Sequence, residues 1–275
     1  YTIASNQVNA IQFLKAQRTL IVGTTGGEFT VSADGTNASI TPTNILINRQ
    51  SSYGSANVDA IPAGNATLFL QRAKRKIREL AYNFDVDGYQ AADMTILNDT
   101  VTTSGINEMA YQQSPDSILW CVRDDGVLAG LTYQRAEQVT AWHRHILGGA
   151  FGNGSAVVES VASISGAINE DELWVIVKRT INGATKRYVE CFADFDFDET
   201  TSTDFRFLDS HLTYDGSATT TLSGLSHLEG QSVSILADGS AHTNKTVSSG
   251  AITLDRSVTK AVVGLSYDSV LQTMR

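Results

Sequence analysis

Two closely spaced histidines are the first candidates for chemistry. His143 and His145 lie two positions apart, so on an extended strand their imidazoles share a face. A zinc site needs a third or fourth ligand at about 2 Å, and the other three histidines all lie beyond residue 210. We therefore expect these side chains to close a strand beside Trp142 and not to bind a metal.

A short acidic run is the next candidate. Asp194, Asp196 and Asp198 alternate with phenylalanines and share one strand face. A calcium loop of the EF-hand type has glycine at its sixth position and glutamate at its twelfth. The sequence has Glu199 and Phe205 there. We expect the acids to face water and the intervening rings to pack inward.

No set of residues predicts a nucleophilic site. Asp209, Ser210 and His211 are consecutive, so on an extended chain they point to opposite faces and cannot form a triad. The sequence has no Gly-x-Ser-x-Gly turn, Walker loop or dinucleotide fingerprint. Cys121 and Cys191 lie in apolar runs, where we expect them to act as small buried hydrophobes. The sequence thus predicts a non-enzyme with no catalytic, cofactor-binding or metal-binding residue.

One basic cluster stands out in the sequence. It consists of Arg72, Lys74, Arg75, Lys76 and Arg78. At the tip of a hairpin it would suit a phosphate or an acidic partner. The favoured interpretation is a solvated turn.

The composition limits the class of protein. The chain has 275 residues, a net charge of −9, 42% apolar and 18% charged residues, which is typical of a folded globular protein. No run approaches the roughly 18 apolar residues of a membrane helix. The acidic balance argues against a broad basic face for nucleic acid. Two cysteines make neither a zinc pattern nor a disulfide framework. Because the chain starts at Tyr1, we expect a fragment of a longer protein.

The local pattern predicts an all-β fold. Short apolar runs are separated by turn dipeptides such as Asp87-Gly88, Asp125-Gly126, Asn182-Gly183 and Asp238-Gly239. Such dipeptides supply the positive φ angles that tight hairpins require. Helical periodicity is nearly absent: even residues 65–81 contain a run, Thr67-Leu68-Phe69-Leu70, that favours a strand.

Four hairpins resemble one another. Their first strands begin at residues 20, 68, 119 and 173, at intervals of 48, 51 and 54. An apolar strand precedes three of them, at 10–14, 106–111 and 157–162. Propeller blades repeat every 40–50 residues or so. We expect a partial β-propeller-like array of antiparallel blades over residues 1–193; the alternative is a plain β-sandwich.

The pattern changes after residue 193. Short strands follow about ten residues apart, at 232–236, 245–247, 251–254 and 260–265, which suits a small β-barrel or sandwich. Residues 1–193 hold 15 basic and 18 acidic groups, whereas residues 194–275 hold 5 and 11. We expect three parts: blade repeats over 1–193, a small β-module over 194–267 and an exiting strand over 268–275.

Two stretches resemble a bacteriophage family. Residues 118–133 (ILWCVRDDGVLAGLTY) with 137–145 (EQVTAWHRH) are similar to large tail proteins of tailed phages and prophages. Residues 212–216, 235–239 and 262–267 resemble the small β-module that follows the propeller repeats in those proteins. That module is often compared with the first catalytic cysteine half-domain of ubiquitin-activating enzymes. Residues 200–275 contain no cysteine, so that chemistry has no counterpart here.

The resemblance implies a structural virion protein of the tail tubular or nozzle type. Its partners would be copies of itself and other tail proteins, with DNA passing without specific binding. It implies a location in the phage tail, and in the bacterial cytoplasm during assembly, with no membrane span. Uncovered terminal blades predict self-association.

A second hypothesis is a carbohydrate- or host-surface-binding module. It relies on rings expected in exposed loops, which would stack on sugars: Tyr53, Tyr89, Phe151 and Tyr214.

Overall fold

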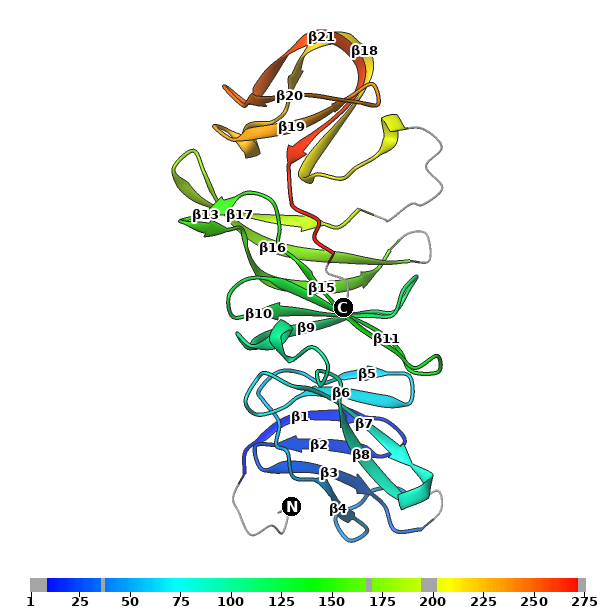
Figure 1. The fold of residues 1–275 in the computed structure, drawn as a ribbon. Coiled ribbons are helices and arrows are strands. Elements are labelled where there is room, and N and C mark those ends of the chain that lie inside the picture. Colours follow the sequence, from blue (N-terminus) through cyan, green and yellow to red (C-terminus); the bar gives the residue numbers. More distant parts are fainter. Residues whose placement is uncertain (1–8, 36–37, 167–169, 194–201, 272–275) are drawn as a thin grey trace. The chain divides into compact units, whose positions relative to one another are not determined.

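The computed structural model describes residues 9–35, 38–166, 170–193 and 202–271. The chain is all-β: its strands form six separate antiparallel sheets, and the described residues contain short 3-10 turns but no α-helix (Figure 1). The predicted fold class is therefore confirmed at the level of secondary structure.

Three of the sheets are four-stranded meanders in which each strand pairs with the next along the chain. The first contains β1 (Ile11–Ala16), β2 (Leu20–Thr24), β3 (Gly27–Ser32) and β4 (Leu46–Ser51). The second contains β5 (Ile61–Ala63), β6 (Ala66–Leu70), β7 (Ile77–Asn83) and β8 (Gly88–Asp93). The third contains β9 (Ile106–Gln112), β10 (Ile118–Arg123), β11 (Leu128–Gln134) and β12 (Val139–His145).

A fourth sheet has three strands among the described residues. They are β15 (Val157–Ser165), β16 (Asp171–Ile181) and β17 (Ala184–Cys191). The short hairpin of β13 (Ala150–Phe151) and β14 (Gly154–Ser155) precedes it. The first strands of the four expected hairpins are β2, β6, β10 and β16, so the repeated hairpin is confirmed as a structural unit.

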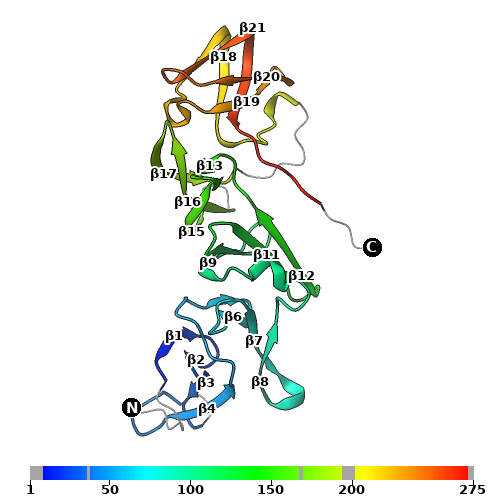
Figure 2. The same cartoon turned by 60° about the vertical axis from the view of Figure 1, so that its left-hand side comes forward.

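The last sheet contains β18 (Asp209–Ser223), β19 (Ser232–Ala237), β20 (Ser240–Thr246) and β21 (Ala251–Leu265), in the order β18-β21-β19-β20 (Figure 2). This sheet is not closed, because β18 and β20 lie at its two edges and do not pair with each other. The expected small β-barrel is therefore wrong. The strands expected at 251–254 and 260–265 are one continuous strand, β21. Its pairing with β18 shifts register three times, as happens where a strand contains β-bulges.

Positive φ angles explain two of the tightest hairpins. Asn182 and Gly183 join β16 to β17 with φ angles of 49° and 71°. Asp238 and Gly239 join β19 to β20 with φ angles of 46° and 75°. Two consecutive left-handed residues match the right-handed twist of the strands on either side.

The chain divides into two compact units, each described here by itself. The first runs to residue 125 and includes 129–144 and 161–171, and so contains the first three sheets. The second comprises 126–128, 145–160 and the residues from 172 onward. The boundary predicted after residue 193 adjoins residues outside the described ranges, and the three-part division stays a prediction.

The inner strands of the second sheet bury side chains on both faces. Leu68, Leu70 and Ile77 form one cluster with side chains of the third sheet. Phe69 and Leu80 form another with side chains of the first sheet. Successive strand residues point to opposite faces, so the uninterrupted apolar run of β6 serves two cores at once.

The last sheet has a core of its own. It consists of leucine, isoleucine, valine and alanine side chains from β18, β19, β21 and the turns between them, including Leu225, Leu228, Val233 and Val263. A separate core is consistent with a module that folds around its own apolar residues.

Candidate functional site

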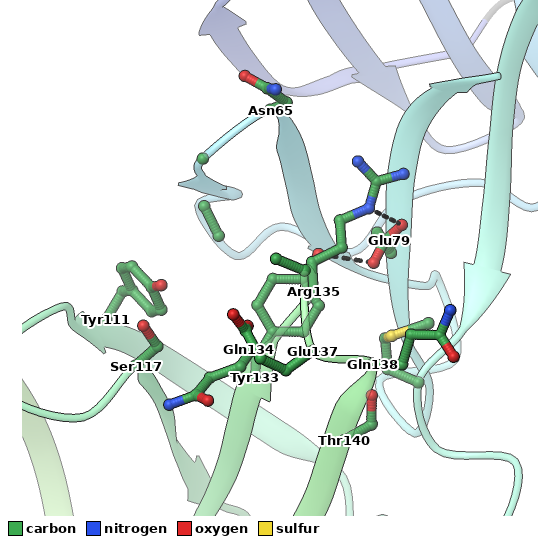
Figure 3. A pocket seen from close by; sticks show the side chains of 14 residues that line it. Asn65, Glu79, Tyr111, Ser117, Tyr133, Gln134, Arg135, Glu137, Gln138 and Thr140 are labelled. Carbon is green, nitrogen blue, oxygen red and sulfur yellow. Dashed lines mark hydrogen bonds and ion pairs between the residues drawn. The ribbon is translucent and has the colours of Figure 1, made fainter. Parts of the chain in front are cut away.

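A cavity of about 930 Å³ opens in the first unit, lined by residues of the second and third sheets (Figure 3). Its size lies within the range of about 300–1,000 Å³ that is usual for small-molecule sites. Strands supply its fixed wall and turns supply its rim. The side chains that it brings together come from positions far apart in the sequence.

A hydrogen-bonded group lies at the centre of the cavity wall. The hydroxyl of Tyr133 donates to Glu79 Oε2 at 2.6 Å, and Arg135 Nε donates to Glu79 Oε1 at 3.0 Å. The Glu79 side chain is only 12% exposed, whereas that of Arg135 is 46% exposed. Burial and the hydrogen bond to Glu79 raise the pKa of Tyr133, which therefore stays a hydroxyl donor at neutral pH.

Secondary structure fixes these three side chains. Glu79 lies on β7, Tyr133 lies on β11, and Arg135 begins the turn between β11 and β12. That turn is closed by Gln138, whose φ is 57° and whose N–H donates to the carbonyl of Arg135 at 3.2 Å. Trp142 anchors the following strand by donating from Nε1 to the carbonyl of Met94 at 2.8 Å.

Other polar side chains around the cavity have spare hydrogen-bonding capacity. Within the described ranges, none of the following side chains hydrogen-bonds to protein: Asn65, Tyr111, Ser117, Gln134, Gln138 and Thr140. In the view of Figure 3, Tyr111 and Ser117 lie to the left of the Arg135–Glu79 pair, and Gln138 and Thr140 lie below it. This arrangement suits binding of a polar molecule.

The basic cluster is mostly engaged in structure. Arg78 is buried, with its guanidinium carbon 3.3 Å from the centre of the Tyr53 ring, and it donates to the carbonyl of Ala91 at 2.9 Å. Lys76 pairs with Asp93 at 2.5 Å. Lys74 Nζ donates to Asn107 Oδ1 at 2.9 Å, which leaves only Arg72 and Arg75 of the five exposed. The turn is thus a packed structural element and not a free basic tip.

The two strand histidines contact aromatic rings. His143 packs edge-on against Trp120, with ring centres 5.5 Å apart, and His145 packs edge-on against Phe192 at 6.0 Å. Burial lowers the pKa of His143. A side-chain carbon on Gly130 would lie 2.1 Å from the His143 ring, so this glycine makes room for the imidazole.

No group of three or more metal-binding side chains is present in the part of the chain that the structure describes. Asp194, Asp196 and Asp198 lie outside the described residues, as does the expected inward packing of the phenylalanines between them. Nor do the described ranges contain a helix long and apolar enough to cross a bilayer.

The four rings expected in exposed loops are mostly half-buried on strands. Tyr89 lies on β8, where its hydroxyl is 3.3 Å from that of Thr19. Phe151 lies on β13 beneath Lys178 Nζ, 4.4 Å from its ring centre. Tyr214 lies on β18 and donates to the carbonyl of Ser217. Only Tyr53 is an exposed loop residue, so these rings do not form the expected sugar-stacking set.

Strands β16 and β17 of the fourth sheet share one exposed face, here called the open face. Its residues alternate along β16 and β17 and are paired across the strands: Trp174 with Cys191, Ile176 with Val189, and Lys178 with Arg187. Ile176 is 37% exposed and Val189 is 68% exposed. Cys191 is also exposed, so the expectation that both cysteines are buried is wrong for this one, because it points to the open face.

Ion pairs border these apolar residues. Glu159 accepts from Lys178 at 2.8 Å and from Arg187 at 2.6 Å. Hydrogen bonds from these two cations lower the pKa of Glu159 to about 2. The open face is thus an apolar strip beside a fixed cluster of charges.

The opposite face of the fourth sheet holds a buried ionic network. Arg179 is fully buried, is paired with Glu190, and donates from Nε to the carbonyl of Gly148 at 2.8 Å. The N–H of Gly148 donates to Asp209 Oδ2 at 2.6 Å. Burial raises the pKa of Asp209. This network ties β16 and β17 to the start of β18.

Comparison with family models and with curated proteins identifies no relative. No family model matches the chain, and no curated protein matches it. The resemblance to phage tail proteins therefore stays a hypothesis from the sequence.

Proposed function

We propose that the protein is a structural component of a phage or prophage tail, of the nozzle or hub type. It acts through contacts between subunits and not through catalysis. Its partners are copies of itself and other tail proteins, and its place is the virion, after assembly in the bacterial cytoplasm. The resemblance of residues 118–133 and 137–145 to tail proteins motivates this proposal.

The repeated meander sheets support it. Three sheets share one strand order, and the fourth repeats the first three strands of that order. Repeated blades of this kind must pack against neighbours, because one blade cannot bury both of its faces alone. We therefore also propose that these four sheets form a partial propeller-like array.

The open face is the observation that carries the proposal. Ile176 and Val189 lie side by side on a sheet whose other face is buried. Exposed apolar residues beside a polar rim are typical of protein–protein contact sites. In a protein built from stacked sheets, we infer that another subunit covers this face.

The net negative charge supports the proposal that DNA passes the protein without binding to it. A net charge of −9 repels the phosphate backbone within a Debye length of about 8–10 Å. A nozzle subunit benefits from that repulsion, because DNA must pass without binding. A basic surface lining the channel of an assembled ring would contradict this part.

Self-association tests the proposed contact. We expect size-exclusion chromatography with light scattering to show oligomers that grow with concentration, and Val189→Glu to abolish them. Val86→Glu, on a valine that is 56% exposed in the first unit, is the matched control and should leave assembly unchanged. A strict monomer at every concentration contradicts the contact.

Gene context and particle composition test the identity. We expect the gene to lie beside genes for portal, capsid and terminase proteins, and mass spectrometry of purified particles to contain the chain. Absence from purified particles of the phage that encodes it would overturn the assignment.

A further inference from the structure

The cavity in the first unit has nearly balanced charge. Glu79 and Arg135 form an ion pair, and Glu137 is the one further charged residue on the lining. An anionic ligand would meet two carboxylates against one guanidinium, whose charge is already balanced by Glu79. Electrostatics therefore favour a neutral ligand.

The free groups of the lining both donate and accept hydrogen bonds. Gln134, Gln138 and Asn65 each offer an amide N–H₂ and a carbonyl oxygen, and Ser117 and Thr140 each offer a hydroxyl. The hydroxyl groups of a sugar also donate and accept. A polyhydroxylated ligand can thus satisfy this lining with many matched hydrogen bonds.

Apolar surface accompanies these polar groups. Tyr111, Met94 and Ala63 also line the cavity, and Figure 3 shows the Tyr111 ring at its side. The C–H face of a pyranose packs on such an aromatic ring, while its hydroxyls reach the polar groups around it. A lining that mixes apolar surface with polar groups is typical of small-molecule sites.

The centre of the site is held in place before any ligand arrives. Glu79 is mostly buried, and its two oxygens accept from Tyr133 and Arg135. Because Glu79 and Tyr133 both lie on strands, little conformational entropy is lost on binding at the contact between these two side chains. The terminal nitrogens of Arg135 have no hydrogen bond to described residues and remain as donors at the cavity.

We propose that this cavity binds a neutral oligosaccharide. Gln134 and Gln138 hydrogen-bond its hydroxyls, Tyr111 stacks on a sugar ring, and Arg135 donates to a ring or hydroxyl oxygen. All lining residues belong to the first unit, so the site is independent of the open face and of the assembly proposed above.

Saturation-transfer NMR and calorimetry test the site with three defined probes: maltotriose, lactose and N,N′-diacetylchitobiose. We expect at least one to bind. The double variant Gln134→Ala/Gln138→Ala and the single variant Tyr111→Ala should each weaken binding by tenfold or more, since each removes about 1.4 kcal/mol or more of interaction. Gln12→Ala, on β1 and outside the cavity, is the control and should bind as the unchanged protein does.

Folding is monitored alongside. The two glutamine side chains make no hydrogen bond to described residues, so their double variant should keep the circular dichroism and unfolding midpoint of the parent chain. Failure of all three probes at millimolar concentration would overturn the proposal. So would binding that survives the double variant, or binding only of a sulfated saccharide such as a heparin tetrasaccharide. An assembling protein that binds no sugar would refute this site and leave the proposed tail role standing.

Discussion

The second and fourth sheets differ in how many faces they bury. Every residue of β6 in the second sheet is buried, and its side chains belong to two hydrophobic clusters, one on each face. On β16 of the fourth sheet, Leu173, Val175 and Val177 are buried, whereas Ile176 is exposed. A continuous apolar run thus accompanies a sheet covered twice, and alternation accompanies a sheet covered once.

The difference also separates the roles of the two sheets. A strand with both faces buried, such as β6, has no surface left for partners, so its side chains contribute to stability alone. A sheet with one exposed apolar face keeps a surface that another molecule can cover. Mutations at doubly covered, singly covered and exposed positions should therefore differ in their cost to stability, and four experiments test that contrast.

The largest effect is expected in the second sheet. Phe69→Ala should lower the free energy of unfolding by about 3–5 kcal/mol and Leu68→Ala by about 2–5 kcal/mol, because each leaves a cavity in a different cluster. Urea unfolding followed by tryptophan fluorescence measures both. A negligible cost for either one would show that its face is not a packed core.

A comparable effect is expected on the covered face of the fourth sheet. Glu190→Ala leaves the fully buried Arg179 without its carboxylate partner. Breaking a buried ion pair from one side costs about 3–5 kcal/mol. Urea unfolding followed by tryptophan fluorescence measures the loss, and Glu190→Gln, which keeps an acceptor oxygen, should recover part of it.

A pH-dependent effect is expected at the charge cluster that borders the open face. The folded-state pKa of Glu159 is about 2, below its ordinary value of 4.5, because Arg187 and Lys178 donate hydrogen bonds to it. A lowered pKa contributes stability that is complete above pH 4.5 and is lost as the pH falls toward 2. Glu159→Gln should therefore make the urea midpoint depend less on pH between pH 5 and 2.

The matched control for this pH series is Glu137→Gln. Glu137 is exposed and makes no hydrogen bond to described residues, so its variant should keep the slope of the parent chain. An unchanged slope in Glu159→Gln would show that the ion pairs do not form in solution.

The smallest effect is expected on the open face itself. Val189→Thr should change the free energy of unfolding by no more than about 0.5 kcal/mol, as is usual for exposed positions. Val177→Thr, on the buried face, should cost about 1–3 kcal/mol because it buries a hydroxyl. Equal costs would mean that the two faces are covered alike.

Much of the fold could be predicted because its signals are local. Asn182-Gly183 and Asp238-Gly239 mark hairpins through their own backbone preferences, and β6, β10 and β16 are apolar runs between such turns. The strand expected at 106–111 is β9, and that expected at 157–162 is the first part of β15. The packing of sheets against one another depends on contacts distant in sequence, and it had no local signal.

Some elements escaped prediction for identifiable reasons. β5 has three residues and contains Pro62, which an edge strand tolerates but which weakens any strand signal. The sequence predicts two strands in place of β21, because Asp255 and Arg256 interrupt its apolar pattern. Both side chains form ion pairs, Asp255 with Lys245 and Arg256 with Asp238.

The cavity could not be predicted from the sequence. Glu79 and Tyr133 are far apart in the chain and meet only because two sheets pack together. The adjacent turn carries a weak local hint, since Gln134 to Gln138 is a polar run between two strands. Of the basic and aromatic residues that the sequence offers as candidates, Arg78 and Tyr53 stack on each other.

The contrast between the two cysteines has a practical consequence. Cys121 is fully buried and burial raises the pKa of its thiol, whereas Cys191 is exposed on the open face opposite Trp174. Maleimide reagents, which attack the thiolate, should therefore label the folded chain once, at Cys191. A fluorophore or spin label placed there, without any substitution, would report when a neighbour docks on this surface.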